Sequence, residues 1–330
     1  MRWTLAAIVL SATAPSACKG TGVEKSEPAR ATMDASQGAI EASSSAPDAS
    51  PAFDAAAPGP VTCTPDPTFP SLLDLPEASA ATEVELRPGV RELLVVADSD
   101  NKGAALAYAI PNGPARRLEL PLATLPKTWD LSASDDVEGV AWRGKHLYTL
   151  VSSGYVERFT PDGNGGLTRD GPAYPLGAPP FVETATGMPG SPPDYEGLCL
   201  RPEGETARCA GYAASRAYGW LFCLVFDGDR LRVDPVHPRV ALDVKKHSLS
   251  DCAFGAADGP ARDVMLVATN FYGGSTVYRF DEGTHALTPI DIAGTANNEG
   301  VAIDHEGRLY QVMDANLEHS PSARATCTGW

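Results

Sequence analysis

Three short stretches of the chain share one pattern, and this pattern decides the fold. They read Asp136-Val137-Glu138-Gly139-Val140, Asp194-Tyr195-Glu196-Gly197-Leu198 and Asn297-Asn298-Glu299-Gly300-Val301. A fourth stretch, Leu249-Ser250-Asp251-Cys252-Ala253-Phe254, keeps a carboxylate but has cysteine where the others have glycine. Each stretch opens a run with the composition of a β-strand. We interpret the four as one internal repeat with a period of roughly 50 residues.

Further strand candidates follow each repeat, and turn residues separate them. Second strands are expected at 92–97, 146–151, 207–213, 264–269 and 308–313. No sustained helical periodicity occurs between residues 61 and 330. Short β-units at this period are typical of a β-propeller with about four strands per blade. We predict an all-β fold, a β-propeller of five blades, with six as the alternative.

The two ends of the predicted propeller are expected to meet. A step back from the first repeat reaches Thr82-Glu83-Val84-Glu85-Leu86, which looks like a first strand without the glycine. The last repeat runs out after two strands, so residues 61–75 are expected to supply its outer strands. This arrangement closes the ring and removes an exposed sheet edge.

The first sixty residues indicate export. Residues 1–17 have the order of a secretory signal, with an apolar run too short to span a bilayer. The segment Pro15-Ser16-Ala17-Cys18 resembles a bacterial lipobox, which implies lipidation of Cys18. Ordinary signal cleavage is the alternative. Residues 18–60, rich in Ala, Ser and Pro, predict a disordered tether. Lys19 favours the outer membrane or the cell surface.

The charge of the chain limits its partners. The formal net charge is −16 at pH 7. Nucleic acid and anionic lipid surfaces carry the same sign and would be repelled. We therefore expect no nucleic-acid partner, and contact with a membrane only through the lipid anchor. A monomer is expected.

The cysteines agree with an oxidising compartment. Seven are present, and assigning Cys18 to lipid leaves an even number. Cys209 and Cys223 are equidistant from the centre of a predicted hairpin, and Cys63 and Cys327 stand at the two ends of the domain. Cys199 and Cys252 are then left to pair. A zinc cluster is the alternative, but the chain has no C-x-x-C spacing.

The repeats resemble a known group of propellers. The Glu-Gly openings and the strand at 307–314 resemble the secreted phytase-like (esterase-like) domains and the related SdiA-regulated group. The segment 250–254 is similar to the Ser-Asp-x-Ala element of these proteins. The resemblance spans roughly residues 83–315 and implies a propeller fold. Related metal-binding lactonase propellers also begin blades with Glu-Gly.

The propeller layout places the repeated acidic residues together. The start of each first strand and the end of each second strand lie at the same mouth of the central channel. We therefore expect a ring of oxygen ligands there: Glu138, Glu196, Asp251, Glu299, Asp98, Asn270 and Asp314. Such ligands suit a hard divalent cation, calcium above all. The alternative is that the carboxylates accept hydrogen bonds from backbone amides of neighbouring blades.

Basic residues near this mouth are few. Arg216 lies at the tip of the predicted hairpin, and Lys246 and His247 precede Asp251. Arg216 and Lys246 are predicted to bind a small anionic or ester ligand, and His247 is the candidate general base. The alternative is that all three lie on solvated loops.

Two functions follow from this site. The first is a metal-dependent esterase, phosphoesterase or lactonase. The alternative is a non-catalytic ligand-binding or scaffolding module of the cell envelope. The sequence has no Gly-x-Ser-x-Gly elbow, His-Glu-x-x-His helix, phosphate loop or dinucleotide fingerprint.

Overall fold

The computed structural model describes residues 60–98, 103–125, 136–177, 194–205, 207–244, 248–270, 274–292, 297–314 and 318–330. These residues form strands and turns, and no helix occurs among them. Accordingly, the described part of the chain contains no helix long and apolar enough to cross a bilayer.

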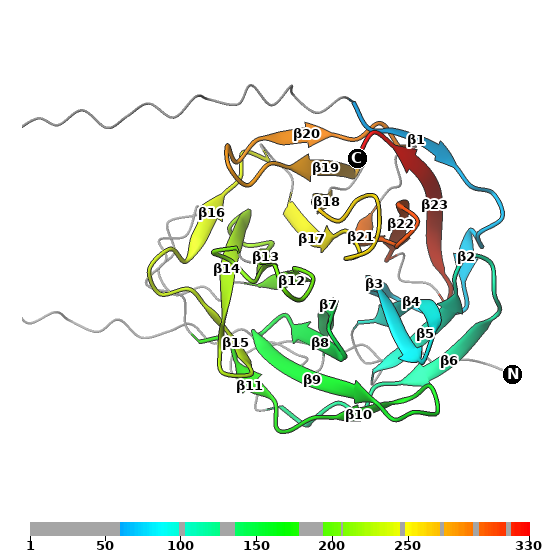
Figure 1. The fold of residues 1–330 in the computed structure, drawn as a ribbon, viewed down its shortest axis with the longest axis horizontal. Coiled ribbons are helices and arrows are strands. Elements are labelled where there is room, and N and C mark those ends of the chain that lie inside the picture. Colours follow the sequence, from blue (N-terminus) through cyan, green and yellow to red (C-terminus); the bar gives the residue numbers. More distant parts are fainter. Residues whose placement is uncertain are drawn as a thin grey trace, which may run out of the picture. The chain divides into compact units, whose positions relative to one another are not determined.

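Five antiparallel sheets surround one axis and form a five-bladed β-propeller (Figure 1). Blade I consists of β3 (Ala78–Arg87), β4 (Val90–Ala97), β5 (Ala104–Ala109) and β6 (Ala115–Glu119). Blade II consists of β7 (Val137–Arg143), β8 (His146–Val151), β9 (Tyr155–Pro161), β10 (Leu167–Arg169) and β11 (Tyr174–Pro175). Blade III consists of β12 (Tyr195–Leu200), β13 (Gly211–Ser215), β14 (Trp220–Asp227), β15 (Arg230–Val233) and β16 (Arg239–Ala241). The prediction of five blades is confirmed.

The last two blades complete the ring. Blade IV consists of β17 (Ser248–Phe254), β18 (Met265–Asn270), β19 (Thr276–Phe280) and β20 (Leu287–Pro289). Blade V consists of β21 (Asn298–Ile303), β22 (Arg308–Met313), β23 (Ser320–Thr328), β1 (Thr62–Pro65) and β2 (Leu72–Leu73). The last repeat was expected to end after two strands. Instead, its third strand is β23, formed by the C-terminal residues of the chain.

Tight turns connect the first two strands of blades I and II. β3 and β4 are separated only by Pro88 and Gly89, and Gly89 has a φ of 73°. Glycine suits such a turn because it adopts positive φ without steric cost. In these two blades the short hairpin keeps the first and second strands in register.

The hydrophobic core lies between blades. Five clusters of buried side chains each join two neighbouring blades, and one of them joins blade V to blade I. Phe222 of blade III, for example, packs in the same cluster as Tyr148 of blade II. Each sheet therefore buries both of its faces against neighbours, which is why an isolated blade is not expected to be stable.

The N-terminal strand closes the ring as the sequence predicted. β1 pairs with β23, and Cys63 lies directly opposite Cys327. These two cysteines form a disulfide bond with a Cα–Cα distance of 4.1 Å. The chain ends are therefore joined both covalently and by strand pairing.

The other two predicted disulfides are also present. Cys199 and Cys252 join the first strands of blades III and IV. Cys209 bonds to Cys223 within blade III, as predicted. The strand register differs from the expected one, since Tyr212 lies opposite Cys223 and Cys209 precedes β13. Three disulfides indicate an oxidising, extracytoplasmic environment.

Candidate functional site

The first strand of every blade contains a β-bulge at the same position. In each blade one residue of the first strand has no partner on the second strand. In β7 this residue lies between Val137 and Gly139, and the other four blades have it at the matching position. The bulged residues are Ser79, Glu138, Glu196, Ser250 and Glu299. A bulge re-aims a side chain, so the repeated Glu marks one level of the channel.

The bulge register corrects the alignment of the fourth repeat. Ser250, not Asp251, is the counterpart of the three glutamates, and Asp251 takes the place of the glycine in the other repeats. In blade I the bulged residue is Ser79, which precedes the expected Thr82–Leu86 stretch. Serine lacks the carboxylate that defined the repeat in the sequence, so the sequence did not show that these two serines are equivalent to the glutamates.

The glycines of the repeat allow the first strands to approach closely. A Cβ atom added at Gly197 would lie 2.6 Å from the Cα of Asp251, and one at Gly300 would lie 2.8 Å from the Cα of Ala80. A Cβ at Gly139 would collide with the backbone of Leu198. We call this level, formed by Ala80, Gly139, Gly197, Asp251 and Gly300, the waist of the channel. The Glu-Gly pair therefore combines a side chain at the mouth with close packing just below it.

Two polar residues, one at the waist and one at the bulge, connect neighbouring blades. The carboxylate of Asp251 accepts a hydrogen bond from the backbone N–H of Val301 at 2.8 Å. The Ser79 hydroxyl donates to the carbonyl of Val137 at 2.5 Å. Asp251 therefore accepts a backbone hydrogen bond from the neighbouring blade, which is the alternative that the sequence left open. Burial raises the pKa of Asp251 well above its usual range.

The three bulged glutamates share one electrostatic environment. Burial, together with the charges of Glu196 and Asp98, raises the pKa of Glu138 well above its usual range. Burial likewise raises the pKa of Glu196, and the negative charge of Glu299 adds to the shift. For Glu299, burial raises the pKa to about 8. Carboxyl groups that repel one another away from water are not all ionised together at neutral pH, so the ring retains protons while Arg216 favours an ionised neighbour.

Arg216 is the cation of this cluster. Its guanidinium lies 3.1 Å from a carboxylate oxygen of Glu196, whose side chain is 3% exposed. It also donates to Asp194 at 2.9 Å. The positive charge of Arg216 opposes the pKa rise of Glu138, Glu196 and Glu299 alike. The three glutamates and Arg216, which we call the carboxyl ring, therefore occupy one mouth of the channel.

The ends of the second strands contribute to the same mouth. Asn270 is the last residue of β18, and its side-chain amide donates a hydrogen bond to the Glu299 carboxylate. The charge of Asp98 raises the pKa of all three glutamates, and that of Asp314 raises the pKa of Glu299. The structure thus brings these three predicted residues next to the carboxyl ring.

Ser250 is a member of this level that the sequence did not single out. Its side chain is 1% exposed, and its hydroxyl has no hydrogen-bond partner among the described residues. A buried hydroxyl without a partner is available to a ligand or water. The bulge between Leu249 and Asp251 identifies Ser250 as the counterpart of the three glutamates.

The predicted calcium site involves the same mouth of the channel. Among them, no group of three or more His, Cys, Asp or Glu residues is arranged to hold a metal ion. A guanidinium within contact distance of Glu196 supplies positive charge where a cation was expected. Lys246, His247 and Cys18 lie outside the described residues. Calcium binding and the roles of these three residues stay predictions.

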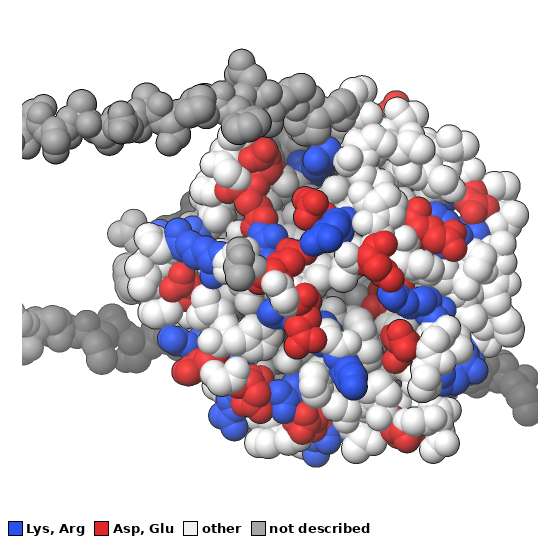
Figure 2. All heavy atoms as spheres, viewed as in Figure 1, with Lys and Arg blue, Asp and Glu red and all other residues white. Residues whose placement is uncertain are grey.

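One face of the propeller carries charges of both signs. Figure 2 shows acidic and basic side chains interspersed over the face drawn in Figure 1. Ion pairs also occur within blades, such as Arg158 with Asp170 at 2.7 Å in blade II.

Comparisons with known proteins assign no family to the chain. No family model and no curated protein matches the chain. The glutaminyl cyclase of Myxococcus xanthus is similar in structure, with a TM-score of 0.43 and 13% identity over 82% of this chain and 100% of that chain. A putative oxidoreductase (glucose dehydrogenase) of Thermus thermophilus has a TM-score of 0.45 and 11% identity over 80% of this chain and 100% of that chain. A putative 6-phosphogluconolactonase of Bacteroides uniformis has a TM-score of 0.39 and 15% identity, covering 67% and 61%.

With TM-scores below 0.5, these similarities carry no argument about the family or the reaction of this chain. The resemblance to the phytase-like and SdiA-regulated propellers stays a prediction.

Proposed function

We propose that the protein is an extracytoplasmic hydrolase that cleaves a small anionic ester, phosphoester or lactone at its carboxyl ring. The observation that carries the proposal is the convergence of three glutamates with raised pKa values on one arginine. Perturbed carboxyl groups beside a cation are characteristic of acid–base sites. In this proposal the N-terminal segment holds the propeller at the outer membrane or cell surface through acylated Cys18.

In this proposal each residue of the carboxyl ring has its own role in hydrolysis. Arg216 binds the anionic group of the substrate and offsets the charge of ionised Glu196. Glu196 takes a proton from the attacking water, and Glu299, protonated at neutral pH, donates a proton to the leaving oxygen. Asn270 holds the Glu299 carboxyl through its amide. His247 and Lys246 remain candidates for assisting these steps from outside the described residues.

The experiment compares hydrolysis of p-nitrophenyl acetate, p-nitrophenyl phosphate and a lactone by the wild type, E299Q and E119Q. Glu119 is exposed at the end of β6 and serves as the matched control. We expect turnover of at least one substrate, a loss of about 100-fold in E299Q, within the usual range for general acids, and no loss in E119Q. Wild-type activity should fall as the pH rises through about 8, where Glu299 loses its proton. Equal rates in E299Q and the wild type would refute the role of Glu299.

A non-catalytic ligand-binding module is the second candidate. Asp251 and Ser79 favour it, because they use the same level of the channel for hydrogen bonds between blades. Absence of turnover with all three substrates, together with binding of a small anion that R216Q abolishes, would select this function. Adding calcium or EDTA in both assays, and following the melting temperature, tests the predicted metal.

A further inference from the structure

A second cavity opens at the end of the channel opposite the carboxyl ring. Its volume is about 930 Å³. The lining begins just beyond the waist, at Val140 and Leu198, and continues to Gly144 and Lys145 in the turn between β7 and β8. The first strands of all five blades contribute to it. The waist therefore separates this cavity from the proposed hydrolytic site.

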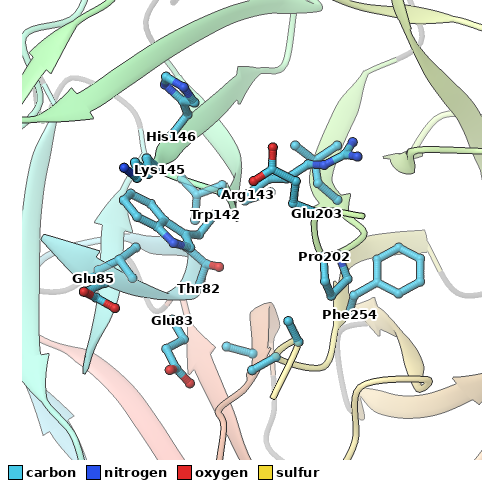
Figure 3. A pocket seen from close by; sticks show the side chains of 18 of the residues that line it. Thr82, Glu83, Glu85, Trp142, Arg143, Lys145, His146, Pro202, Glu203 and Phe254 are labelled. Carbon is cyan, nitrogen blue, oxygen red and sulfur yellow. The ribbon is translucent and has the colours of Figure 1, made fainter. Parts of the chain in front are cut away.

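The inner wall of the cavity is apolar. Val84, Leu86, Leu200 and Ile303 line it together with the indole of Trp142. Trp142 and Phe254 lie on opposite sides of the opening (Figure 3). A cavity of this volume, with an apolar inner wall and charged groups at its edge, has the character of a small-molecule site.

Most acidic side chains at the edge of the cavity already have partners. Glu83 lies 2.8 Å from Arg91 and 2.9 Å from His305. Asp258 lies 2.7 Å from the same arginine, and Glu85 lies 3.9 Å from it. Arg91 therefore offsets part of the negative charge on this side of the opening, where one guanidinium faces three carboxylates.

The turn between β7 and β8 supplies basic groups on the other side. Arg143, Lys145 and His146 line the cavity within four successive positions. No ion pair of Arg143 or Lys145 occurs among the described residues, and the Arg143 guanidinium lies 4.5 Å from the ring centroid of Phe226. His146 approaches Asp170 at 3.9 Å. One Arg143 nitrogen is buried without a hydrogen-bond partner in the described part of the chain. Glu203, which lies beside Gly144, is the acidic group facing this turn.

The described chain ends lie at the same end of the channel. The Trp330 indole donates to the carbonyl of Gly307, in the turn between β21 and β22, at 3.0 Å. Pro60 lies beside Gly329, where an added Cβ would be 2.8 Å from its carbonyl oxygen. The described chain thus begins and ends at the end of the channel that carries the cavity.

We propose that this cavity binds an amphipathic molecule with an aliphatic chain and one anionic head group. The chain would lie against Trp142 and the apolar wall, where burial of each methylene contributes about 0.8 kcal/mol. The head group would contact Lys145 and Arg143 at the edge. A carboxylate and a phosphate share this chemistry, and the proposal does not depend on hydrolysis at the carboxyl ring.

The test uses the full chain carrying C18A, which removes the predicted acylation site. Amphiphiles are titrated into the protein below their critical micellar concentration, and calorimetry measures the binding. Dodecanoate and dodecyl phosphate distinguish the two head groups. Dodecanol and dodecyltrimethylammonium carry the same chain without the anion. We expect saturable binding of at least one anion, at least tenfold tighter than that of the neutral and cationic compounds.

Variants locate the binding. K145E should weaken anion binding at least tenfold, and T82F, which fills the cavity from β3, should abolish it. R232E reverses a charge on β15, outside the cavity lining, and should leave binding unchanged. E299Q should bind as the wild type, so failure of the hydrolase proposal and failure of this one are distinguishable. Equal binding of anion and cation, or full binding by T82F, would overturn the proposal.

Discussion

The replacement E299Q tests the buried carboxyl ring through the stability of the fold. Burial raises the pKa of Glu299 from 4.5 to about 8. Between these two pH values the folded state holds a proton that the unfolded state has released, so stability falls as the pH rises. Each pH unit in this window corresponds to about 1.4 kcal/mol. Below pH 4.5 both states are protonated, and above pH 8 both are ionised, so the dependence ends.

Glutamine cannot release the proton, so E299Q lacks this dependence. From pH 6 to pH 8 the stability of the wild type relative to E299Q should therefore fall by up to about 2.7 kcal/mol, and by about 1 to 2 kcal/mol if the site relaxes around the charge. Urea unfolding followed by intrinsic tryptophan fluorescence at several pH values measures the difference. E119Q, an exposed change of the same kind, should follow the wild type. A constant difference between E299Q and the wild type from pH 6 to pH 8 would refute the inferred burial of this carboxyl.

Two further predictions concern the waist and the ring closure. G197A should destabilise the fold by about 1 to 3 kcal/mol, because the new Cβ collides with Asp251, whereas G274A, which meets no atom within 4 Å, should be neutral in the same urea assay. Equal effects would contradict the close approach of the first strands. Replacing the Cys63–Cys327 pair by serine should cost about 5 kcal/mol, and replacing Cys209–Cys223 about 3 kcal/mol, because the bridges span 264 and 14 residues. Calorimetric melting of both variants checks this order, and the reverse order would count against a ring closed by the chain ends.

The fold could be predicted because the repeat has a physical cause. In three blades a glutamate points into the mouth, and the glycine after it allows two first strands to approach closely. These two residue types therefore recur together in the sequence, as Glu138-Gly139, Glu196-Gly197 and Glu299-Gly300. The disulfides could be predicted because the chain ends and hairpins limit the pairings. Both inferences depend on local constraints that leave a residue-type signature.

The rest of the site depends on contacts that leave no such signature. Ser250 replaces the glutamate in blade IV, and the neighbouring Asp251 supplied a carboxylate that suggested the wrong register. Arg216 contacts Glu196 because β13 ends beside this glutamate. The sequence placed Arg216 at the tip of a hairpin and did not show this contact. The second cavity combines residues from all five blades, and its apolar members look like ordinary core positions in the sequence.

The most direct test of the shared carboxyl ring is an NMR titration of the glutamate side-chain carboxyl carbons in the wild type and in R216Q. Because Arg216 favours the ionised form of all three glutamates, R216Q should raise the titration midpoints of Glu138, Glu196 and Glu299 together. In the wild type, the midpoint of Glu299 should lie at about 8. Midpoints near 4.5, or midpoints that R216Q leaves unchanged, would contradict the convergence of these residues at one mouth of the channel.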